Sequence, residues 1–418
     1  MTASSSSRPY DAAVIGGGVV GCAVARRLTL EGARVVLVER AADILAGASK
    51  GNSAILHTGF DAPADSLELA CMRRGYAEYL AIRERLNLPL LETGAAVVAW
   101  TDAEAGALDG IRARAHANGV GDVRPMDVGE LRGREPALAE DAVAALWVPG
   151  EHVIDPWSAP LAYLTQAVAN GAELRRGCGV EGGRFDGAVW RLDTTAGPIA
   201  ARAVVNAAGL FGDRLERAIL GASEFTIHPR KGQFVVFDKA AAALLTTTIL
   251  PVPSERTKGV VLVRTAFGNL LVGPTAEEQD DRERATVEPA TLRDLIDRAV
   301  RMVPGLRDMP VTATYAGLRP ASEDKAYRVR FDAERRYLRL GGIRSTGLTA
   351  ALGLAAHAAE RLAEIDIGGA PLAAPVWPEV PNLAEHRPRP WQGPEGGDIV
   401  CHCERVTRGE IRRALAGP

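Results

Sequence analysis

The sequence predicts an α/β plus α+β protein, in which a domain on a parallel sheet carries an inserted domain built on an antiparallel β-sheet. Residues 11–40 contain an apolar run, a glycine-rich turn, an amphipathic stretch and a second apolar run, the pattern of strand, helix and strand. Residues 228–327 contain short β-branched runs between turn residues, which favour antiparallel strands. At 418 residues the chain is long enough for both units, since a domain has about 100 to 200 residues.

The glycine-rich turn has the form G-x-G-x-x-G, with Gly16, Gly18 and Gly21 at the three glycine positions. They allow a tight turn, close approach of a pyrophosphate to the backbone, and close packing of helix on strand. The second strand ends at Glu39, where a carboxylate can accept hydrogen bonds from both hydroxyls of an adenosine ribose. The region therefore predicts a Rossmann-like domain that binds a dinucleotide, with a purely structural glycine turn as the alternative.

Composition and charge argue against several classes of partner. The net charge is -3 and no run of Lys or Arg occurs, so nothing favours nucleic acid. No window approaches about 18 uninterrupted apolar residues, so no transmembrane segment is expected. Residues 1–9 lack the apolar core of a secretory signal and are expected to be a disordered tail. Five cysteines in a chain of this size do not form a disulfide framework, which favours a cytoplasmic location.

The remaining elements follow from periodicity and turn residues. Helices are expected at 66–86 and 102–118, with one strand from Leu90 to Trp100 between them. Asp155-Pro156-Trp157 is expected to open a helix that runs to about Ala169, with the proline in its first turn. The other expected elements are strands at 173–180, 203–206, 232–238, 260–264, 270–273, 311–317 and 337–340, and helices at 292–303 and from Gly347 to about Ala363.

Residues 48–60 form a loop of small residues, expected to be neither helix nor strand, which lets the backbone approach a flat ligand. Its form S-x-x-N-S-x-x-x-H-x-G, together with the glycine motif and Glu39, resembles the opening of the D-amino-acid oxidase-like superfamily of flavoproteins. Asn52 to Gly59 is most similar to the anaerobic glycerol-3-phosphate dehydrogenase and L-2-hydroxyglutarate dehydrogenase branches. The resemblance implies non-covalent FAD, with this segment running past the pyrophosphate and along the isoalloxazine.

Two later segments fit the same cofactor. Residues 204–209 are an apolar strand ending in small residues, which the family carries beneath the pyrophosphate. A glycine-rich turn precedes the helix that opens at Gly347, and the N–H groups there can stabilise negative charge on a reduced flavin. A buried strand that stops at Gly209 and a turn before a core helix are the structural alternatives. The residues expected to bind FAD are Gly16, Gly18, Val19, Val20, Gly21, Glu39, Arg40, Ser49, Asn52, Ser53, Ala207, Ala208, Gly209, Gly342, Ser345, Gly347, Leu348 and Thr349.

Together these features predict a discontinuous arrangement of domains. It consists of a tail (1–9), an FAD-binding domain (10–88, 150–222 and 335–368), a substrate domain (89–149 and 223–334), a Pro-rich linker (369–397) and a partial iron–sulfur domain (398–418).

Four side chains are candidates for the chemistry. His57 lies in the loop expected along the flavin and could act as a base, since imidazole titrates near neutrality; a structural histidine is the alternative. The family places the arginine of a G-x-R-P segment over the flavin to grip carboxylate or phosphate, which favours Arg319 over a surface ion pair. Lys231 and Gln233, at the start of another strand, are further candidates for substrate contacts, against a solvated turn.

The last residues carry a second resemblance. Asp398 to Ile411 contains C-x-C followed by E-x-V-T-x-x-E-I, which resembles the start of a bacterioferritin-associated-ferredoxin-like domain. That domain ligates a two-iron two-sulfur cluster with four thiolates, and the sequence ends at Pro418, before a second C-x-x-C pair. Cys401 and Cys403 therefore supply at most half of a site, and no metal site and no complete iron–sulfur cluster are expected in this chain.

These features predict an FAD-dependent dehydrogenase that oxidises a small anionic hydroxy compound by hydride transfer to FAD, with glycerol 3-phosphate as first choice. An L-2-hydroxy acid such as L-2-hydroxyglutarate is the alternative, followed by an amine or imino acid and by a non-catalytic FAD-binding electron-relay subunit. The electrons are expected to pass to a quinone, a redox partner subunit or a diffusible acceptor. A homo-oligomer and peripheral association with a membrane stay open.

Overall fold

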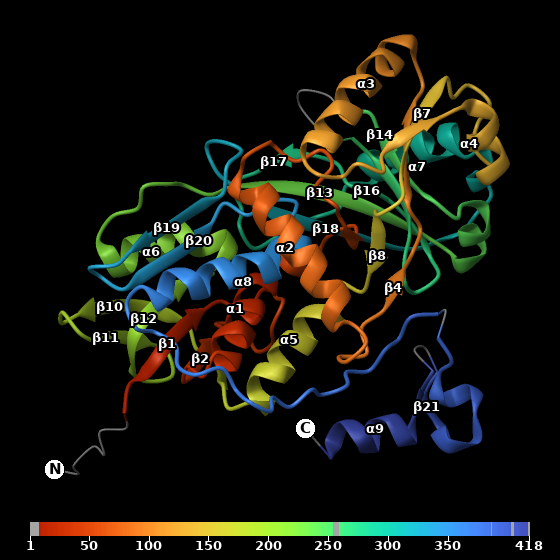
Figure 1. Ribbon diagram of the computed structural model, residues 1–418. Helices are drawn as coiled ribbons and strands as arrows, with labels where there is room; N and C mark the ends of the chain where they lie inside the picture. Colours follow the sequence, from red (N-terminus) through yellow and green to blue (C-terminus); the bar gives the residue numbers. More distant parts are fainter. Residues whose placement is uncertain (1–7, 254–258, 386, 403–404, 417–418) are drawn as a thin grey trace.

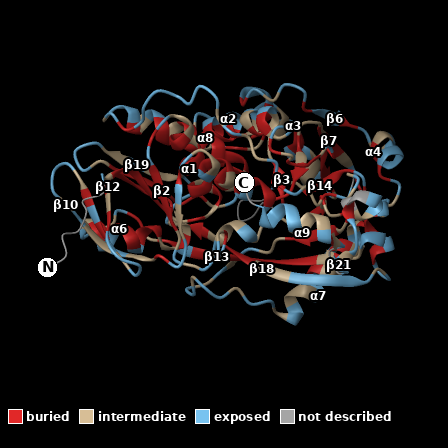
Figure 2. Cartoon of the chain, turned by 90° about the horizontal axis from the view of Figure 1, so that it is seen from below, coloured by how far each residue is buried: buried red, intermediate tan, exposed pale blue. Residues whose placement is uncertain are grey.

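The computed structural model describes residues 8–253, 259–385, 387–402 and 405–416. These residues form two large sheets, one of eight strands and one of nine, each with its own helices (Figure 1). Buried residues follow the interior of both halves of the molecule, and the outer loops are exposed (Figure 2). The predicted fold class is confirmed. Residues 1–7 of the expected tail lie outside the described residues.

The eight-stranded sheet contains the glycine motif. Its strands are β1 (Tyr10–Ile15), β2 (Val35–Val38), β9 (Glu173–Arg175), β10 (Val180–Phe185), β11 (Trp190–Thr194), β12 (Ile199–Asn206), β19 (Arg328–Asp332) and β20 (Tyr337–Gly341). The order is β10-β11-β12-β1-β2-β9, with β20 beside β12 and β19 beside β20. The pairs of β1 with β2 and β12, of β2 with β9, and of β12 with β20 are parallel. β1 and β2 are apolar and fully buried, as expected for parallel strands covered on both faces.

Four helices gather on one face of this sheet (Figure 1). They are α1 (Val19–Leu30), α2 (Leu67–Ile82), α5 (Ser158–Ala169) and α8 (Gly347–Ala363), whereas α6 (Gly212–Leu220) packs against β10 and β20. α2 crosses α8 at two glycines: a Cβ on Gly75 would collide with the Thr349 carbonyl, and one on Gly353 with the Cys71 carbonyl. The two helices are therefore in backbone contact, which holds the start of α8 against α2.

The nine-stranded sheet forms the second half. Its strands are β5 (Ala95–Ala99), β6 (Arg124–Met126), β7 (Ala144–Val148), β13 (His228–Phe237), β14 (Thr248–Pro251), β15 (Val261–Arg264), β16 (Leu270–Gly273), β17 (Glu277–Glu278) and β18 (Val311–Ala321). The order is β17-β13-β16-β15-β14-β5-β7-β6, with β18 beside β13. Its helices are α3 (Asp102–Ala117), α4 (Val128–Arg134) and α7 (Pro289–Met302). The sheet is antiparallel, as predicted, except that β5 and β14 are parallel.

A sheet of three short strands joins the predicted small-residue loop to a distant turn. β3 (Ile55–Leu56) pairs with β8 (His152–Ile154), and β8 also pairs with β4 (Leu90–Leu91). Leu56 lies opposite His152, so the residues that follow β3 and precede β8 are brought side by side. The expectation that residues 48–60 hold neither helix nor strand was wrong in detail, since a short 3₁₀ helix (Ala48–Lys50) precedes β3.

Other element predictions also need correction. The single strand expected from Leu90 to Trp100 is two strands, because Gly94 turns the chain with φ +59°. Helix α5 starts at Ser158, and Asp155 accepts hydrogen bonds from the N–H groups of Trp157 and Ser158, so Pro156 precedes the helix. β19 belongs to the first sheet, although it precedes the boundary predicted at residue 335. The division into domains stays a prediction. The remaining 3₁₀ helices are Gly209–Phe211, Lys239–Leu244, Pro304–Leu306, Pro390–Gln392 and Pro394–Gly396.

The expected Pro-rich linker is packed along the body for much of its length, and we call residues 369–385 the strap. Its N–H groups at Gly369 and Leu372 donate to the carbonyls of Glu31 and Leu30, at the end of α1. Trp377 has the guanidinium groups of Arg26 and Arg85 over its ring, 5.7 and 3.6 Å from the ring centroid. At the far end, the Glu385 N–H donates to the Ala266 carbonyl in the turn between β15 and β16.

Beyond the strap the described residues form a small hairpin and a helix. β21 (Ile399–Cys401) pairs with β22 (Val406–Thr407), and α9 (Arg408–Leu415) follows. Thr407 and Glu410 cap this helix reciprocally, but none of its residues is buried. Weak packing is expected of so short a segment.

Candidate active site

One cavity of about 520 Å³ runs from the end of β2 to the start of α8. It is lined by sixteen of the predicted cofactor residues: Gly16, Gly18, Val19, Val20, Glu39, Arg40, Ser49, Asn52, Ser53, Ala207, Ala208, Gly209, Gly342, Ser345, Gly347 and Leu348. The two others, Gly21 and Thr349, lie behind its wall. A Cβ on Gly21 would collide with the Gly16 carbonyl, which is the predicted close packing of helix on strand. Thr349 accepts a hydrogen bond from the His57 N–H at 3.0 Å.

Backbone geometry shapes the end of this cavity near β2. Gly16 has φ +111°, and a Cβ there would lie 2.5 Å from the Ala207 carbonyl oxygen. The Ser49 hydroxyl accepts from the Val19 N–H at 3.0 Å, which joins the small-residue loop to the first turn of α1. The Glu39 carboxylate accepts from the N–H groups of Gly17 and Ala41 at 2.7 and 2.8 Å. Its direction at the end of β2 is therefore fixed by two backbone donors.

A second cavity of about 300 Å³ continues past Glu39. The two cavities share Gly16, Glu39, Arg40, Ala208 and Phe211. Its outer wall contains Cys178, Gly179 and Val180, which were not predicted as site residues. Cys178 and Gly179 lie in a turn without a motif, and Val180 begins β10; the pairing of β2 with β9 brings this segment beside Glu39, whose carbonyl accepts from the Cys178 N–H.

At the other end, His57 meets a carboxylate that sequence analysis missed. His57 Nδ1 lies 2.7 Å from Glu151 Oε2, and the His57 ring also lines the cavity. The Glu151 side chain is 0% exposed, compared with 20% for His57. Glu151 stands ninety-four residues further along the chain, in the Gly-Glu-His turn that β3 and β8 bring alongside. No local pattern in the sequence marks this pairing.

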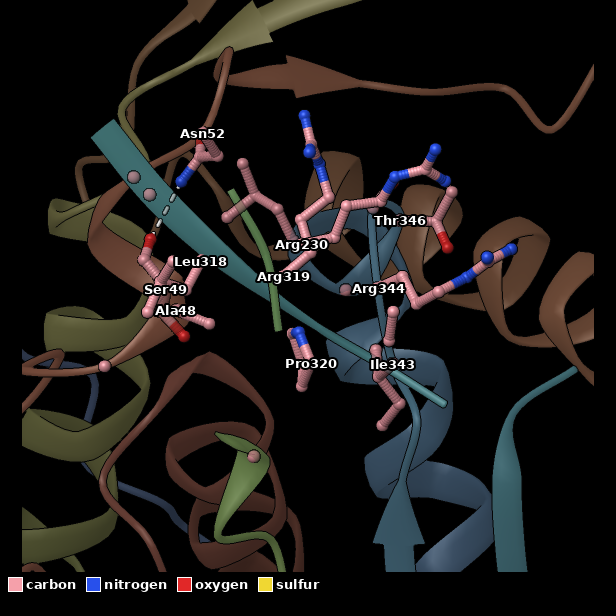
Figure 3. A pocket seen from close by; sticks show the side chains of 18 of the residues that line it. Ala48, Ser49, Asn52, Arg230, Leu318, Arg319, Pro320, Ile343, Arg344 and Thr346 are labelled. Carbon is pink, nitrogen blue, oxygen red and sulfur yellow. Dashed lines mark hydrogen bonds between the residues drawn. The ribbon is translucent and has the colours of Figure 1, made fainter. Parts of the chain in front are cut away.

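Three arginines line the cavity close to one another (Figure 3). Arg230 on β13 and Arg319 on β18 are register partners, and Arg344 comes from the turn before α8. The Arg319 guanidinium donates only to the carbonyls of Thr275 and Lys231 at 3.1 and 3.5 Å, and no carboxylate of the described residues lies within ion-pair distance of it. Burial, together with Arg230 and Arg344, lowers the pKa of Arg319 to about 10. Arg319 could therefore pair with an anionic ligand, whereas Arg230 already forms an ion pair with Glu278 at 3.1 Å.

The backbone of β13 makes room for this arginine. A Cβ on Gly232 would lie 2.7 Å from Arg319 Nη2. Lys231 and Gln233, the other two candidates, do not line the cavity. Lys231 pairs with Glu288 and Glu277 at 2.6 and 3.2 Å, and the Gln233 amide also donates to both carboxylates. Successive residues of a strand face opposite ways, so both side chains point away from the face that carries Arg230. The geometry therefore favours a role in holding the sheet together.

Strand β18, which we call the roof strand, touches the small-residue loop through backbone atoms. A Cβ on Gly317 would lie 2.5 Å from the Gly51 carbonyl oxygen, and one on Gly51 would lie 2.7 Å from Gly317 Cα. The Tyr315 hydroxyl donates to the Asn52 carbonyl at 2.7 Å, and Asn52 Nδ2 donates to the Ser49 carbonyl (Figure 3). These contacts set the distance between the loop that carries His57 and the strand that carries Arg319.

A hydrogen-bonded chain along the wall was also missed by sequence analysis. The hydroxyls of Tyr327 and Thr346 lie 2.6 Å apart, and Thr346 donates to Glu68 Oε1 at 2.7 Å. All three residues line the cavity. Burial, and to a smaller extent the Glu68 carboxylate, raises the pKa of the Tyr327 hydroxyl, so it is protonated at neutral pH.

The sequence profile of the family described as "FAD dependent oxidoreductase" (DAO) matches residues 11–361. The chain belongs to this family. The resemblance found in the sequence is thereby confirmed, and the protein is an FAD-dependent oxidoreductase.

Curated relatives of this oxidoreductase have several substrates in their names. The chain is 28% identical to a glycerol 3-phosphate dehydrogenase of Caloramator mitchellensis, over 97% of this chain and 86% of that protein. It is 32% identical to a glycine oxidase of Geobacillus kaustophilus, over 75% and 82% of the two chains. It is also 26% identical to a mitochondrial L-2-hydroxyglutarate dehydrogenase of Caenorhabditis elegans, over 69% and 68%.

A solved structure has the same architecture. The dithionite-reduced L-α-glycerophosphate oxidase of Mycoplasma pneumoniae, which has FAD bound, superimposes with a TM-score of 0.83. The two sequences are 26% identical, and the match covers 90% of this chain and 100% of that one.

The residues of the cavity fit FAD. Helices α1 and α8 both begin at its wall, and helix N-termini present N–H groups that favour negative charge. Gly16 and Gly18 leave the backbone bare at the first of these N-termini, and Glu39 supplies a fixed acceptor beyond it. A cavity that continues on both sides of this point suits an elongated dinucleotide better than a compact ligand.

The part of the chain that the structure describes contains nothing comparable for a metal ion. Among the described residues no three His, Cys, Asp or Glu side chains are grouped to hold one. Cys22, Cys71 and Cys178 are buried, and burial raises the pKa of the Cys71 thiol to about 12. Cys403, one half of the C-x-C pair, lies outside the described residues, so the question of the cluster stays a prediction. No described helix combines the length and apolar character that crossing a bilayer requires.

Proposed function

We propose that this oxidoreductase oxidises a small anionic hydroxy compound by hydride transfer to non-covalently bound FAD, with glycerol 3-phosphate as the first choice. The observation that carries the proposal is one cavity lined both by an imidazole and by a buried guanidinium that has no carboxylate partner among the described residues. A phosphate or carboxylate would supply the negative counter-charge for Arg319, because guanidinium binds both groups bidentately. The similarity to glycerol 3-phosphate dehydrogenase, which spans nearly the whole chain, supports the choice of substrate.

FAD supplies the acceptor for the hydride that leaves the substrate carbon. The N-terminus of α1 would hold its pyrophosphate and Glu39 its ribose, while the N-terminus of α8 would stabilise negative charge on the reduced flavin. The residues proposed for this role are those that line the cavity, with Gly21 and Thr349 acting from behind the wall.

The protein side chains divide the remaining work. Arg319, with Arg230 and Arg344 beside it, binds the anionic group and so fixes the substrate in one orientation. His57 Nε2 accepts the hydroxyl proton as the carbon–hydrogen bond is broken, and the hydroxyl becomes a carbonyl. Tyr327 also lines the cavity, but its hydroxyl donates to Thr346, because the Thr346 proton goes to Glu68, so toward a substrate hydroxyl it can only accept.

Other substrates fit parts of this arrangement. An L-2-hydroxy acid with a second carboxylate would use the same three arginines. An amine or imino acid is favoured by the relative with the highest identity quoted above, a glycine oxidase. A non-catalytic electron-relay subunit would not need an imidazole held by a buried carboxylate, so this alternative has the least support.

Anaerobic mixing with a substrate panel tests the proposal. Purified protein should be yellow, and denaturation should release its flavin, since no covalent link is proposed. Glycerol 3-phosphate should bleach the flavin, while L-2-hydroxyglutarate, glycine and L-proline should do so slowly or not at all. Bleaching by an amino acid alone would contradict the proposal, and bleaching by L-2-hydroxyglutarate alone would replace the first choice by its alternative.

The electron acceptor is proposed to be a quinone, a redox partner subunit or a diffusible acceptor. Reoxidation of the bleached protein by dioxygen, by a soluble quinone and by an artificial dye separates these classes. Iron and acid-labile sulfide in stoichiometric amounts would contradict the expectation that this chain holds no complete cluster.

A further inference from the structure

We infer that Glu151 is a positioning residue that holds His57 in the one tautomer able to accept the substrate proton. The inference rests on the proposed function, in which His57 Nε2 is the proton acceptor. It goes beyond that proposal by assigning a role to a buried carboxylate remote from His57 in the sequence.

Both carboxylate oxygens of Glu151 form hydrogen bonds with the segment that carries His57. Oε2 lies 2.7 Å from His57 Nδ1. Oε1 accepts from the Thr58 N–H at 2.6 Å and from the Thr58 hydroxyl at 2.8 Å. The side chain is fully buried, so water does not replace any of these partners. A buried carboxylate is stable only when hydrogen bonds and charge compensate its desolvation, and here the compensating groups all belong to His57 and Thr58.

The turn that carries Glu151 is itself held in place. The pairing of β3 with β8 sets Leu56 opposite His152, so the two chains cannot slide past each other without breaking the ladder. The Tyr76 hydroxyl donates to the Gly150 carbonyl at 2.7 Å, next to Glu151. The position of the carboxylate is therefore determined by α2 and β8, independently of any ligand.

The consequence for His57 follows from hydrogen-bond chemistry. An ionised carboxylate can only accept, so His57 Nδ1 must carry the proton of the 2.7 Å hydrogen bond. In a neutral imidazole the other nitrogen, Nε2, then has a free lone pair. When Nε2 takes the hydroxyl proton, the ring becomes positive beside the Glu151 charge, which stabilises it. The substrate loses this proton and a hydride to FAD, which together convert the hydroxyl into a carbonyl.

Glu151→Gln is the most informative substitution, because it keeps the shape. Its amide oxygen can still accept from Thr58, but its NH₂ group faces His57 Nδ1 and must donate there. His57 would then carry its proton on Nε2 and could not accept another as a neutral ring. We expect flavin reduction to slow by about 10²- to 10⁴-fold, with little change in KM or in flavin content. Glu151→Asp keeps the charge and should recover part of the rate.

Tyr76→Phe is the matched control. It removes a hydrogen bond that holds the same turn but leaves the pair of Glu151 and His57 intact. Its rate of reduction should stay within about twofold of the unsubstituted protein. A loss in Tyr76→Phe equal to that in Glu151→Gln would mean that Glu151 only supports the turn, and would overturn the inference.

A measurement without substrate keeps the inference testable even if a variant does not fold. The FAD-loaded protein is labelled with ¹⁵N-histidine, and the His57 signals, among the seven histidines, are assigned with His57→Asn. Nδ1 should show the shift of a protonated ring nitrogen and Nε2 that of a bare one. The opposite pattern would overturn the inference whatever the substrate is. If no hydroxy compound reduces the flavin, the proposed function fails, whereas the tautomer still decides the role of Glu151.

Discussion

The two ends of the cavity are built by different means. Near β2 the polar contacts come from the main chain: Glu39 is held by two N–H groups, and glycines bring the backbone to the wall. Near β18 they come from long side chains, above all His57 and Arg319, whose own partners lie far away in the sequence. At the first end the close approach of backbone atoms leaves no space for larger side chains. At the second end the contacts depend on charged side chains.

This difference predicts how each end responds to change. A side chain added at the glycine end displaces backbone, so its effect should appear in folding and flavin content. A charge removed at the other end leaves the fold intact, because Arg319 contributes no ion pair among the described residues. Its effect should appear in turnover alone.

Replacing His57 by Asn should give the largest effect on turnover. Asparagine can still bond to Glu151 but cannot accept a proton, so flavin reduction should slow by about 10²- to 10⁴-fold. Single-turnover absorbance measures this step directly. KM and flavin content serve as the internal control, and a rate that stays unchanged would remove His57 from the chemistry.

Replacing Arg319 by Leu should have the second largest effect on turnover. Removing one partner of a buried ion pair with a bound anion costs about 2–5 kcal/mol, so kcat/KM should fall by about 30-fold to several thousand-fold. The matched variant Arg319→Lys keeps the charge without the bidentate geometry and should lose less. Glycerol, which lacks the phosphate, should react equally poorly with all three proteins. Loss of the flavin in Arg319→Leu would show instead that this residue supports the fold.

The pH dependence of KM tests whether the charged form of Arg319 binds the anionic substrate. Burial and two neighbouring arginines lower the pKa of Arg319 to about 10. The charged form that binds the anion is therefore complete well below pH 10 and is lost as the pH rises through this value. KM for the anionic substrate should rise by up to about tenfold per pH unit beyond it. Flavin content across the same range is the control, and a flat KM up to pH 11 would contradict the prediction.

Gly317→Ala should have a smaller effect of a steric kind. The new methyl would lie 2.5 Å from the Gly51 carbonyl oxygen, so the roof strand and the loop must separate. Such overpacking costs about 1–3 kcal/mol, which denaturant unfolding can measure. Gly106→Ala is the contrasting control: this exposed glycine in α3 has open space around it, and alanine should stabilise the helix by about 0.5–1 kcal/mol. Equal effects of the two would contradict the steric account.

The sequence revealed one end of the site more fully than the other. Gly16, Gly18 and Glu39 were recognisable because a tight turn and a ribose acceptor need these residue types at a fixed spacing. His57 and Arg319 were selected from their segments, and both line the cavity, although their roles stay proposals. Glu151 and Arg344 were missed because tertiary structure alone brings them there.

The prediction for β13 selected side chains on the wrong face of the strand. Lys231 and Gln233 were selected, but the neighbouring Arg230 lines the cavity. The alternation of side chains along a strand was known from the sequence, whereas the face that would meet the cavity was not. It is set by the register with β18, in which Arg230 lies opposite Arg319.

The strap connects the two large sheets before the chain reaches its last residues. Helix α8 ends at Ala363 in the sheet that carries the glycine motif, yet Glu385 is bonded to the turn at Ala266, which belongs to the other sheet. The chain that leads to the hairpin with Cys401 therefore leaves from the nine-stranded sheet. A shift of this sheet relative to the sheet with the glycine motif would pull on the strap, whose Trp377 is held by two arginines.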